Sequence, residues 1–171
     1  MTDLSVRERL QPSLLDRLTD DDTGATQEPR DKRQLTMRGL RRAVLRDLGW
    51  LLNATGLGTV QDLDDYPLTA QSVINFGFPD LSGKTASGLD MEQVARRMRQ
   101  AIWDYEPRIL RDSVQVLVRA GGPDAGAPNH IVFEVHGQLW GQPLPERLYL
   151  KTELDLELGE IRVYDQDAGA P

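Results

Sequence analysis

The spacing of apolar residues changes along this chain, from a helical period in the first two thirds to alternation in the last third. Residues 37–53 and 90–105 carry apolar side chains three and four positions apart, as one face of an amphipathic helix requires. From Ser113 onward, apolar and polar residues alternate as they do in half-buried strands. The four alternating runs are 113–119, 131–135, 148–154 and 161–163. Helices followed by strands predict an α+β domain, in which an antiparallel sheet of about four strands packs against two main helices.

One domain is the expected organisation, because 171 residues suffice for a single substantial core. We expect this domain to span residues 35–165. Residues 1–34 are expected to hold a short N-terminal helical peptide and a flexible linker, since the apolar segment that ends at Leu18 is followed by a polar stretch with Gly24 and Pro29. Residues 166–171 are expected to be a disordered tail.

The N-terminal peptide contains Leu14, Leu15 and Leu18, in a segment too short to form a stable helix alone. Two interpretations are open. The leucines dock on a partner protein, as short apolar helices do in grooves, or they pack on the core of their own domain.

Charge is unevenly distributed. The net charge is −7, yet residues 30–47 hold seven lysines and arginines against two aspartates. Three of the arginines, Arg38, Arg42 and Arg46, recur at four-residue steps along one helix face. The acidic remainder of the chain weighs against nucleic-acid binding, and the basic helix is more typical of a solvated face or of a docking surface for an acidic partner.

The sequence also indicates in which cellular compartment the protein is located. There is no cysteine, which suits a reducing environment, and no stretch approaches the roughly 18–20 apolar residues that cross a bilayer. No secretory signal is visible at the N-terminus. We therefore expect a cytoplasmic protein that does not insert into a membrane.

Candidate catalytic and metal sites are weak. The stretch from Gly77 to Gly83 resembles a phosphate-binding loop, but it has five residues between its glycines where that loop has four. The histidines, His130 and His136, stand six residues apart with no cysteine to complete a zinc site. No serine lies in a nucleophile-elbow context. The sequence therefore predicts no catalytic residue, no metal and no cofactor.

The tripeptide Glu106-Pro107-Arg108 stands where the helix over 90–105 meets the first strand. Pro107 ends the helix, because it disfavours helical geometry at the residue before it and cannot donate the next backbone hydrogen bond. Taken alone, the tripeptide fits a helix terminator flanked by charges. It also does not fit a glycosidase acid, because the nearby Arg108 favours the ionised carboxylate of Glu106.

Five segments in order give the chain a resemblance to the TssE family, baseplate subunits of the bacterial type VI secretion system that are similar to the wedge proteins of contractile-phage baseplates. The segments are PSLLDRL at 12–18, LRRAVLRDL at 40–48, SVINFGFPDL at 72–81, AI and YEPR within 101–108, and TELD at 152–155 before Gly159. The resemblance covers roughly residues 10–165. It departs from the family at Leu158 and in the long connection 121–128, both of which affect loops.

The resemblance implies a structural role, although such proteins are often labelled lysozyme-like. It implies a subunit at the cytoplasmic face of the inner membrane that links the wedge proteins TssF and TssG, with TssK nearby, to a contractile sheath of TssB and TssC. A peptidoglycan glycosidase is the alternative. The family's domain is thought to resemble the interlocking domain of sheath subunits, so we expect a strand from the sheath to add to an edge of the sheet. The residues predicted to mediate protein interactions are Glu106, Pro107, Arg108, Leu14, Leu15, Leu18, Arg38, Arg42 and Arg46.

Overall fold

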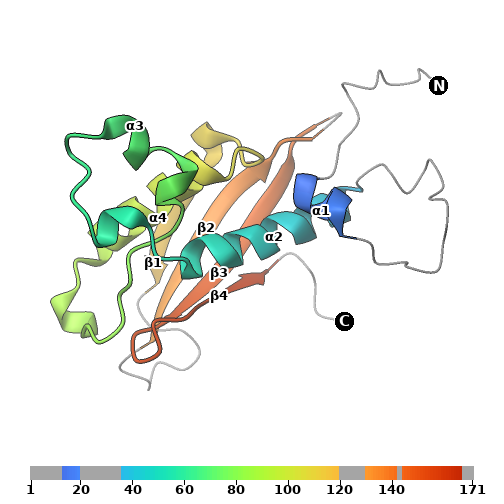
Figure 1. Ribbon diagram of the computed structural model, residues 1–171. Coiled ribbons are helices and arrows are strands. Elements are labelled where there is room, and N and C mark those ends of the chain that lie inside the picture. Colours follow the sequence, from blue (N-terminus) through green and yellow to red (C-terminus); the bar gives the residue numbers. More distant parts are fainter. Residues whose placement is uncertain (1–12, 20–35, 120–129, 142–143, 167–171) are drawn as a thin grey trace, which may run out of the picture.

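Helices precede strands along the chain, as the change of apolar period predicts (Figure 1). The computed structural model describes residues 13–19, 36–119, 130–141 and 144–166. The helices and turns are α1 (Leu14–Leu18), α2 (Met37–Asn53), η2 (Leu57–Thr59), α3 (Pro67–Ala70), η3 (Val73–Asn75), η4 (Ala86–Gly88), α4 (Met91–Tyr105) and η5 (Arg111–Ser113). The strands are β1 (Gln115–Arg119), β2 (His130–Leu139), β3 (Glu146–Asp155) and β4 (Ile161–Asp165). Most of the predicted linker, the connection 121–128 and most of the predicted tail lie outside the described residues.

The strands form one antiparallel sheet in the order β1-β2-β3-β4. The two central strands, β2 and β3, pair over ten residues, from His130 opposite Asp155 to Leu139 opposite Glu146. The edge strands β1 and β4 each pair over five residues. The predicted α+β class and its four-stranded antiparallel sheet are confirmed.

Both long helices cover the same face of the sheet (Figure 1). Helix α4 packs beside the edge strand β1, and α2 packs beside the opposite edge strand β4. The alternating residues of the strands meet the apolar faces of the helices, and this burial is the main driving force for folding. The most deeply buried core side chains are Val44, Leu48, Leu51, Met98, Ile102, Phe133, Val135, Leu139, Leu148, Leu150, Leu154 and Leu156.

The ends of the long helices are set by their sequences. Thr36 caps α2 by accepting a hydrogen bond from the Gly39 amide at 3.1 Å, and Asp90 caps α4 by accepting one from the Gln93 amide at 3.1 Å. Helix α4 stops immediately before Pro107, as predicted, and its last backbone bond runs from the Glu106 amide to the Ile102 carbonyl at 2.9 Å.

The loop before α4 is pinned to the end of α2. Gly77 has a φ of +145°, and a side-chain carbon there would lie 2.4 Å from the Ala54 carbonyl oxygen. This close approach lets the Phe78 amide donate to the same carbonyl at 2.7 Å. The loop is thereby held against the end of α2 and beside the end of α4.

Candidate docking surface at the Glu106-Pro107-Arg108 turn

The turn after α4 contains a buried ion pair. The Glu106 side chain is only 3% exposed. Arg108 binds both of its oxygens, with Nε donating to Oε1 at 2.6 Å and Nη2 to Oε2. The Arg108 backbone amide adds a third bond to Oε1 at 3.2 Å. This two-point geometry is the strong form of an arginine–carboxylate pair. Pro107 sits between the two partners and is exposed.

The same arginine reaches the other long helix. Arg108 Nη2 donates to Asp47 Oδ2 on α2 at 2.6 Å. Burial alone would lower the pKa of the Arg108 guanidinium, but the carboxylates of Glu106 and Asp47 outweigh it and raise that pKa, so the group stays charged. The turn thus braces the end of α4 against α2.

The charged contacts continue from Asp47 to the N-terminal peptide. Arg46 Nε donates to Asp47 Oδ1 at 2.8 Å, and Arg46 Nη1 donates to Asp16 Oδ1 on α1 at 2.5 Å. Asp16 also closes a capping box with Ser13, so the five-residue helix α1 is stabilised at its start. We call the series Glu106–Arg108–Asp47–Arg46–Asp16 the ion-pair relay. It joins α4, α2 and α1 through residues that lie far apart in the sequence.

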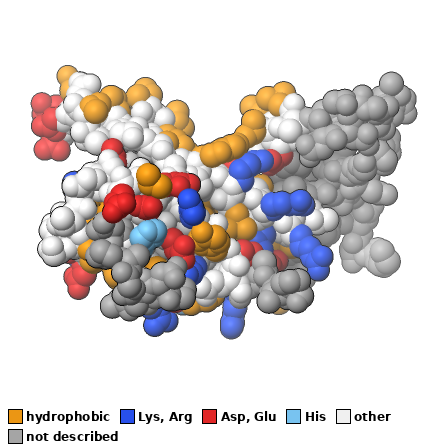
Figure 2. All heavy atoms as spheres, turned by 90° about the horizontal axis from the view of Figure 1, so that it is seen from below, with side chains coloured by type: hydrophobic (Ala, Val, Ile, Leu, Met, Phe, Trp, Pro, Cys, Tyr) orange, Lys and Arg blue, Asp and Glu red, His pale blue; other side chains and the backbone are white. Residues whose placement is uncertain are grey.

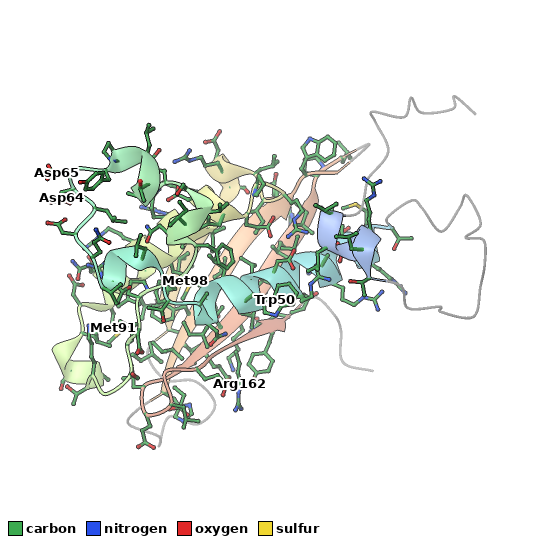
Figure 3. The ribbon with its side chains drawn as sticks, in the orientation of Figure 1. Trp50, Asp64, Asp65, Met91, Met98 and Arg162 are labelled. Atoms are coloured by element: carbon green, nitrogen blue, oxygen red, sulfur yellow. The ribbon has the colours of Figure 1, made fainter. Side chains whose placement is uncertain are left out.

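An apolar groove of about 290 Å³ lies beside the relay. Its walls include Leu15 from α1, Trp50 and Leu51 from α2, Phe76 after η3 and Tyr105 at the end of α4. Glu106 and Arg108 form one end of it. Figure 3 labels Trp50, which projects from α2, and Arg46 lies over its ring at 4.9 Å from the ring centre.

The groove has apolar borders on both sides. Leu14 and Leu18 of α1 are 71% and 74% exposed, and Val73 and Ile74 of η3 are exposed as well. The end of α4 holds η3 in place, because Phe76 packs edge-on against Tyr105 and the Tyr105 hydroxyl donates to the Ser72 carbonyl at 3.2 Å. Figure 2 shows a hollow in the surface, at the top of the view, between two groups of hydrophobic side chains. A surface of this kind is typical of a protein-binding site.

The three leucines predicted to mediate binding point in different directions from α1. Leu15 faces the groove and lies next to the domain, whereas Leu14 and Leu18 point outward. None of the three is buried, since Leu15 is still 43% exposed, so the leucines do not form part of the core of the domain.

The predicted arginine row does not form a unit. Arg46 belongs to the relay, while Arg38 and Arg42 are exposed on α2. Their neighbour Arg41, which sequence reasoning did not single out, instead binds Asp165 of β4 through two bonds of 2.5 and 2.7 Å, and Glu146 of β3 at 2.9 Å.

Sequence reasoning missed Asp47, which connects the turn to the peptide. The signal was present, because Asp47 interrupts the basic run and follows Arg46 directly. Its partner Arg108 lies 61 positions away, and no local pattern predicts such a pairing.

Within the described residues, no group of three or more His, Cys, Asp or Glu side chains is placed to hold a metal ion. Both histidines lie on β2, where His130 is 3.8 Å from Asp155 of β3 and His136 is 3.6 Å from Glu134 of the same strand. No helix among the described residues is long and apolar enough to span a membrane.

The described residues thus form an α+β domain in which two helices cover one face of a four-stranded sheet, with a buried ion pair and an apolar groove at one corner. Residues 38–144 match the family model of baseplate wedge protein gp25, and the chain belongs to this family. The match runs from the start of α2 through β2 and includes the turn. It agrees with the resemblance to TssE, the type VI homologue of gp25. Neither a curated protein nor a solved structure matches the chain.

Membership places the protein among the structural components of phage-tail-like baseplates, which bind other baseplate proteins. The buried, doubly paired state of Glu106 fits a structural role, because the only acid of the turn is committed to holding two helices together.

Proposed function

We propose that this protein is the wedge subunit of a type VI secretion baseplate, which joins TssF and TssG, with TssK nearby, to the first layer of a TssB–TssC sheath at the cytoplasmic face of the inner membrane. The observation that carries the proposal is the ion-pair relay beside the apolar groove. It joins the N-terminal peptide, α2 and the turn after α4 through side-chain ion pairs, and we infer that this holds the corner of the domain rigid. A subunit that seeds a polymer needs such rigidity, since the geometry of the first layer is copied by the next.

The groove and α1 are the proposed contact with the wedge proteins. Leu14 and Leu18 lie at positions i and i+4, so they project together from α1, and Trp50 adds a large exposed aromatic surface nearby. Exposed apolar and aromatic groups around a groove supply most of the affinity in many interfaces. The exposed Arg38 and Arg42 on α2 would add charge attraction for an acidic partner surface.

The proposed interface includes the turn Glu106-Pro107-Arg108, which supports one wall of the groove. Glu106 is buried and Arg108 is held from two sides, so their main contribution is to fix the groove wall, while the exposed Pro107 and the exposed part of Arg108 meet the partner. In this division residues 1–34 form the docking peptide and its linker, residues 35–165 form the wedge domain, and residues 166–171 form a tail.

The sheet is the proposed contact with the sheath. An exposed sheet edge pairs readily with an extended segment of another chain, since main-chain hydrogen bonds supply affinity and alternating side chains supply register. The alternative function, a peptidoglycan glycosidase, gains no support from the turn, because the Glu106 side chain is 3% exposed and both of its oxygens are bound by Arg108, which leaves none to meet a glycosidic oxygen.

The wedge contact is tested with the double variant Leu14→Ser/Leu18→Ser, co-expressed with TssF and TssG. Both leucines are mostly exposed, so we expect an unchanged thermal melt but at least a tenfold loss of TssF and TssG in the co-purified complex. Leu158→Ser is the matched control, since Leu158 is an equally exposed leucine (69%) in the turn between β3 and β4. A complex that survives the double variant at the wild-type level would refute the assigned role of α1.

A further inference from the structure

The segment between α2 and α4 carries apolar side chains that the core does not use. Val60, Tyr66, Leu68, Val73 and Ile74 lie in or beside η2, α3 and η3, and each of them is more than half exposed. Because η3 lies against both η2 and α3, these short elements form one surface, which we call the apolar platform (residues 57–75). Scattered exposed apolar residues are ordinary, but a group of them in one place marks a site of protein association.

Hydrogen bonds hold the platform in shape, since no side chain of η2, α3 or η3 is buried. The Asn75 side chain accepts from the Gly58 amide at 2.7 Å and donates to the Ala70 carbonyl at 2.8 Å, so it ties η3 to η2 and to the end of α3. The Tyr105 hydroxyl fastens the same segment to α4 through the Ser72 carbonyl. A surface that is already held in shape loses little conformational entropy on binding, which favours affinity for a partner.

The platform has an acidic edge. Residues 54–83 contain four aspartates and no lysine, arginine or histidine. Three of the aspartates, Asp62, Asp64 and Asp65, stand just before α3, are exposed, and form no ion pair with a lysine or arginine of the described residues. Figure 3 labels Asp64 and Asp65, which point outward from the loop before α3. These carboxylates repel nucleic acid and anionic lipid, and they attract an apolar protein surface that is flanked by lysine or arginine.

The opposite side of the apolar groove carries the opposite charge. Arg17 of α1 and Arg38 and Arg42 of α2 are exposed and form no ion pair with a carboxylate in the described part of the chain. Figure 2 shows basic side chains to the right of the hollow, and acidic side chains at the left end of the molecule beside the hydrophobic group on that side. A partner that covers both sides must therefore be acidic at one end and basic at the other, which fixes its orientation.

We propose that the apolar platform is a second docking site, separate from α1, and that its occupant is an apolar segment of the TssF–TssG complex flanked by lysine or arginine residues. This inference rests on the proposed function. Val73 and Ile74 belong to the platform and also border the groove, so the platform continues the proposed wedge contact beyond η3. The apolar side chains of the segment cover Leu68 and Val73, and its basic residues meet Asp64 and Asp65. Two contacts on one chain reinforce each other, since binding at the first raises the effective concentration at the second.

A single introduced cysteine tests whether the platform is covered, because the chain contains no cysteine of its own. Leu68→Cys places the probe on α3, and Leu158→Cys is the matched control, because Leu158 is an exposed leucine in the turn between β3 and β4. Each variant of the full chain is labelled with a maleimide, alone and in complex with TssF and TssG, and mass spectrometry measures the label on this chain. We expect the complex to slow the labelling of Leu68→Cys about tenfold or more, because an interface excludes water and reagent, and to leave Leu158→Cys unchanged.

Charge reversal tests the chemistry of the occupant. We expect Asp64→Lys/Asp65→Lys to bind the TssF–TssG complex about tenfold more weakly at about 50 mM NaCl, and about threefold more weakly at about 500 mM, because salt screens exposed charges. Glu157→Lys/Glu160→Lys is the control, since it changes the net charge equally at two exposed acids of the turn between β3 and β4. This control should bind as the wild type does, and the thermal melts of both variants should match the wild type.

The outcomes separate this inference from the proposed function. Labelling of Leu68→Cys that is as fast in the complex as in the isolated chain, or slowed no more than that of Leu158→Cys, would refute the platform as a docking site. Wild-type affinity of Asp64→Lys/Asp65→Lys at low salt would refute its basic occupant. If the platform fails these tests while Leu14→Ser/Leu18→Ser still removes TssF and TssG, the proposed function stands on α1 alone. A wild-type chain that binds neither TssF nor TssG would overturn the proposed function itself.

Discussion

Replacing Arg108 with methionine tests how much stability the turn contributes. The substitution keeps most of the apolar stem of the side chain and removes the guanidinium, which leaves the 3% exposed carboxylate of Glu106 with one remaining donor, the backbone amide at 3.2 Å. Removing one partner of a fully buried pair costs about 3–5 kcal/mol. The Arg108 side chain is 25% exposed, so water replaces part of the loss, and we expect a cost of about 2–4 kcal/mol.

The assay is a double-mutant cycle measured by thermal and urea unfolding. At about 4 °C per kcal/mol for a domain of this size, Arg108→Met should lower the melting temperature by about 8–16 °C. Glu106→Gln in the same chain removes the stranded charge, so the double variant should be more stable than the sum of the single changes predicts, with a coupling free energy of about 1–3 kcal/mol.

Arg97→Met is the control, since Arg97 is an exposed arginine on α4 and its loss should change stability by no more than about 0.5 kcal/mol. If Arg108→Met unfolds within that same margin of the wild type, or if the cycle shows no coupling, then the turn does not brace the two helices and the reasoning from its geometry fails.

Two further predictions concern the surroundings of the groove. Gly77→Ala should destabilise the domain by more than about 1 kcal/mol, because the residue has a positive φ and its new methyl group would lie 2.4 Å from the Ala54 carbonyl oxygen; urea unfolding checks this, and a change near zero would show that the loop can move away. Burial alone would raise the pKa of Asp16, but hydrogen bonds from Arg46 and Ser13 outweigh it and hold the pKa below 3.8. A carboxyl group whose pKa is lowered by folding stabilises the folded state at pH values above its ordinary pKa, and this stabilisation is lost as the pH falls through the lowered pKa. We therefore expect α1 to detach below about pH 3.8 while the sheet stays folded. Amide exchange of Leu15 against that of Phe133 measures the difference, and α1 signals that stay protected at pH 2.5 would contradict it.

The period of the apolar residues was enough to predict the main elements. The helix expected over 37–53 is α2, and the one expected over 90–105 is α4 with Asp90 as its cap. The first strand begins at Gln115 and not at Ser113, because residues 111–113 form the turn η5 and Ser113 uses its hydroxyl to accept from the Gln138 amide. Local periodicity predicts which face of an element is buried. It does not predict where a turn or a side-chain hydrogen bond replaces strand pairing at the end of that element.

The site was only partly predictable. The sequence predicted that α4 ends before Pro107, with a charged residue on each side of the proline, because the end of a helix is set by local sequence. Three features depend instead on which elements come together in space. They are the pairing of Arg108 with Asp47, the hydrogen bond from the Ile161 amide to the Asn53 side chain, and the position of Leu15 at the groove. Contacts across 61 and 108 positions are set by tertiary packing, and a single sequence carries no pattern for them.

The central claim is that this protein acts as a rigid structural piece from which a sheath grows. Its most direct test is fluorescence imaging of labelled TssB in the bacterium that encodes this protein. The gene for the protein is deleted, and the cells carry either a plasmid copy of the wild-type gene or the empty vector. The account predicts extended sheaths with the wild-type gene and none with the empty vector. Sheaths of normal length and number in the cells without the protein would contradict it.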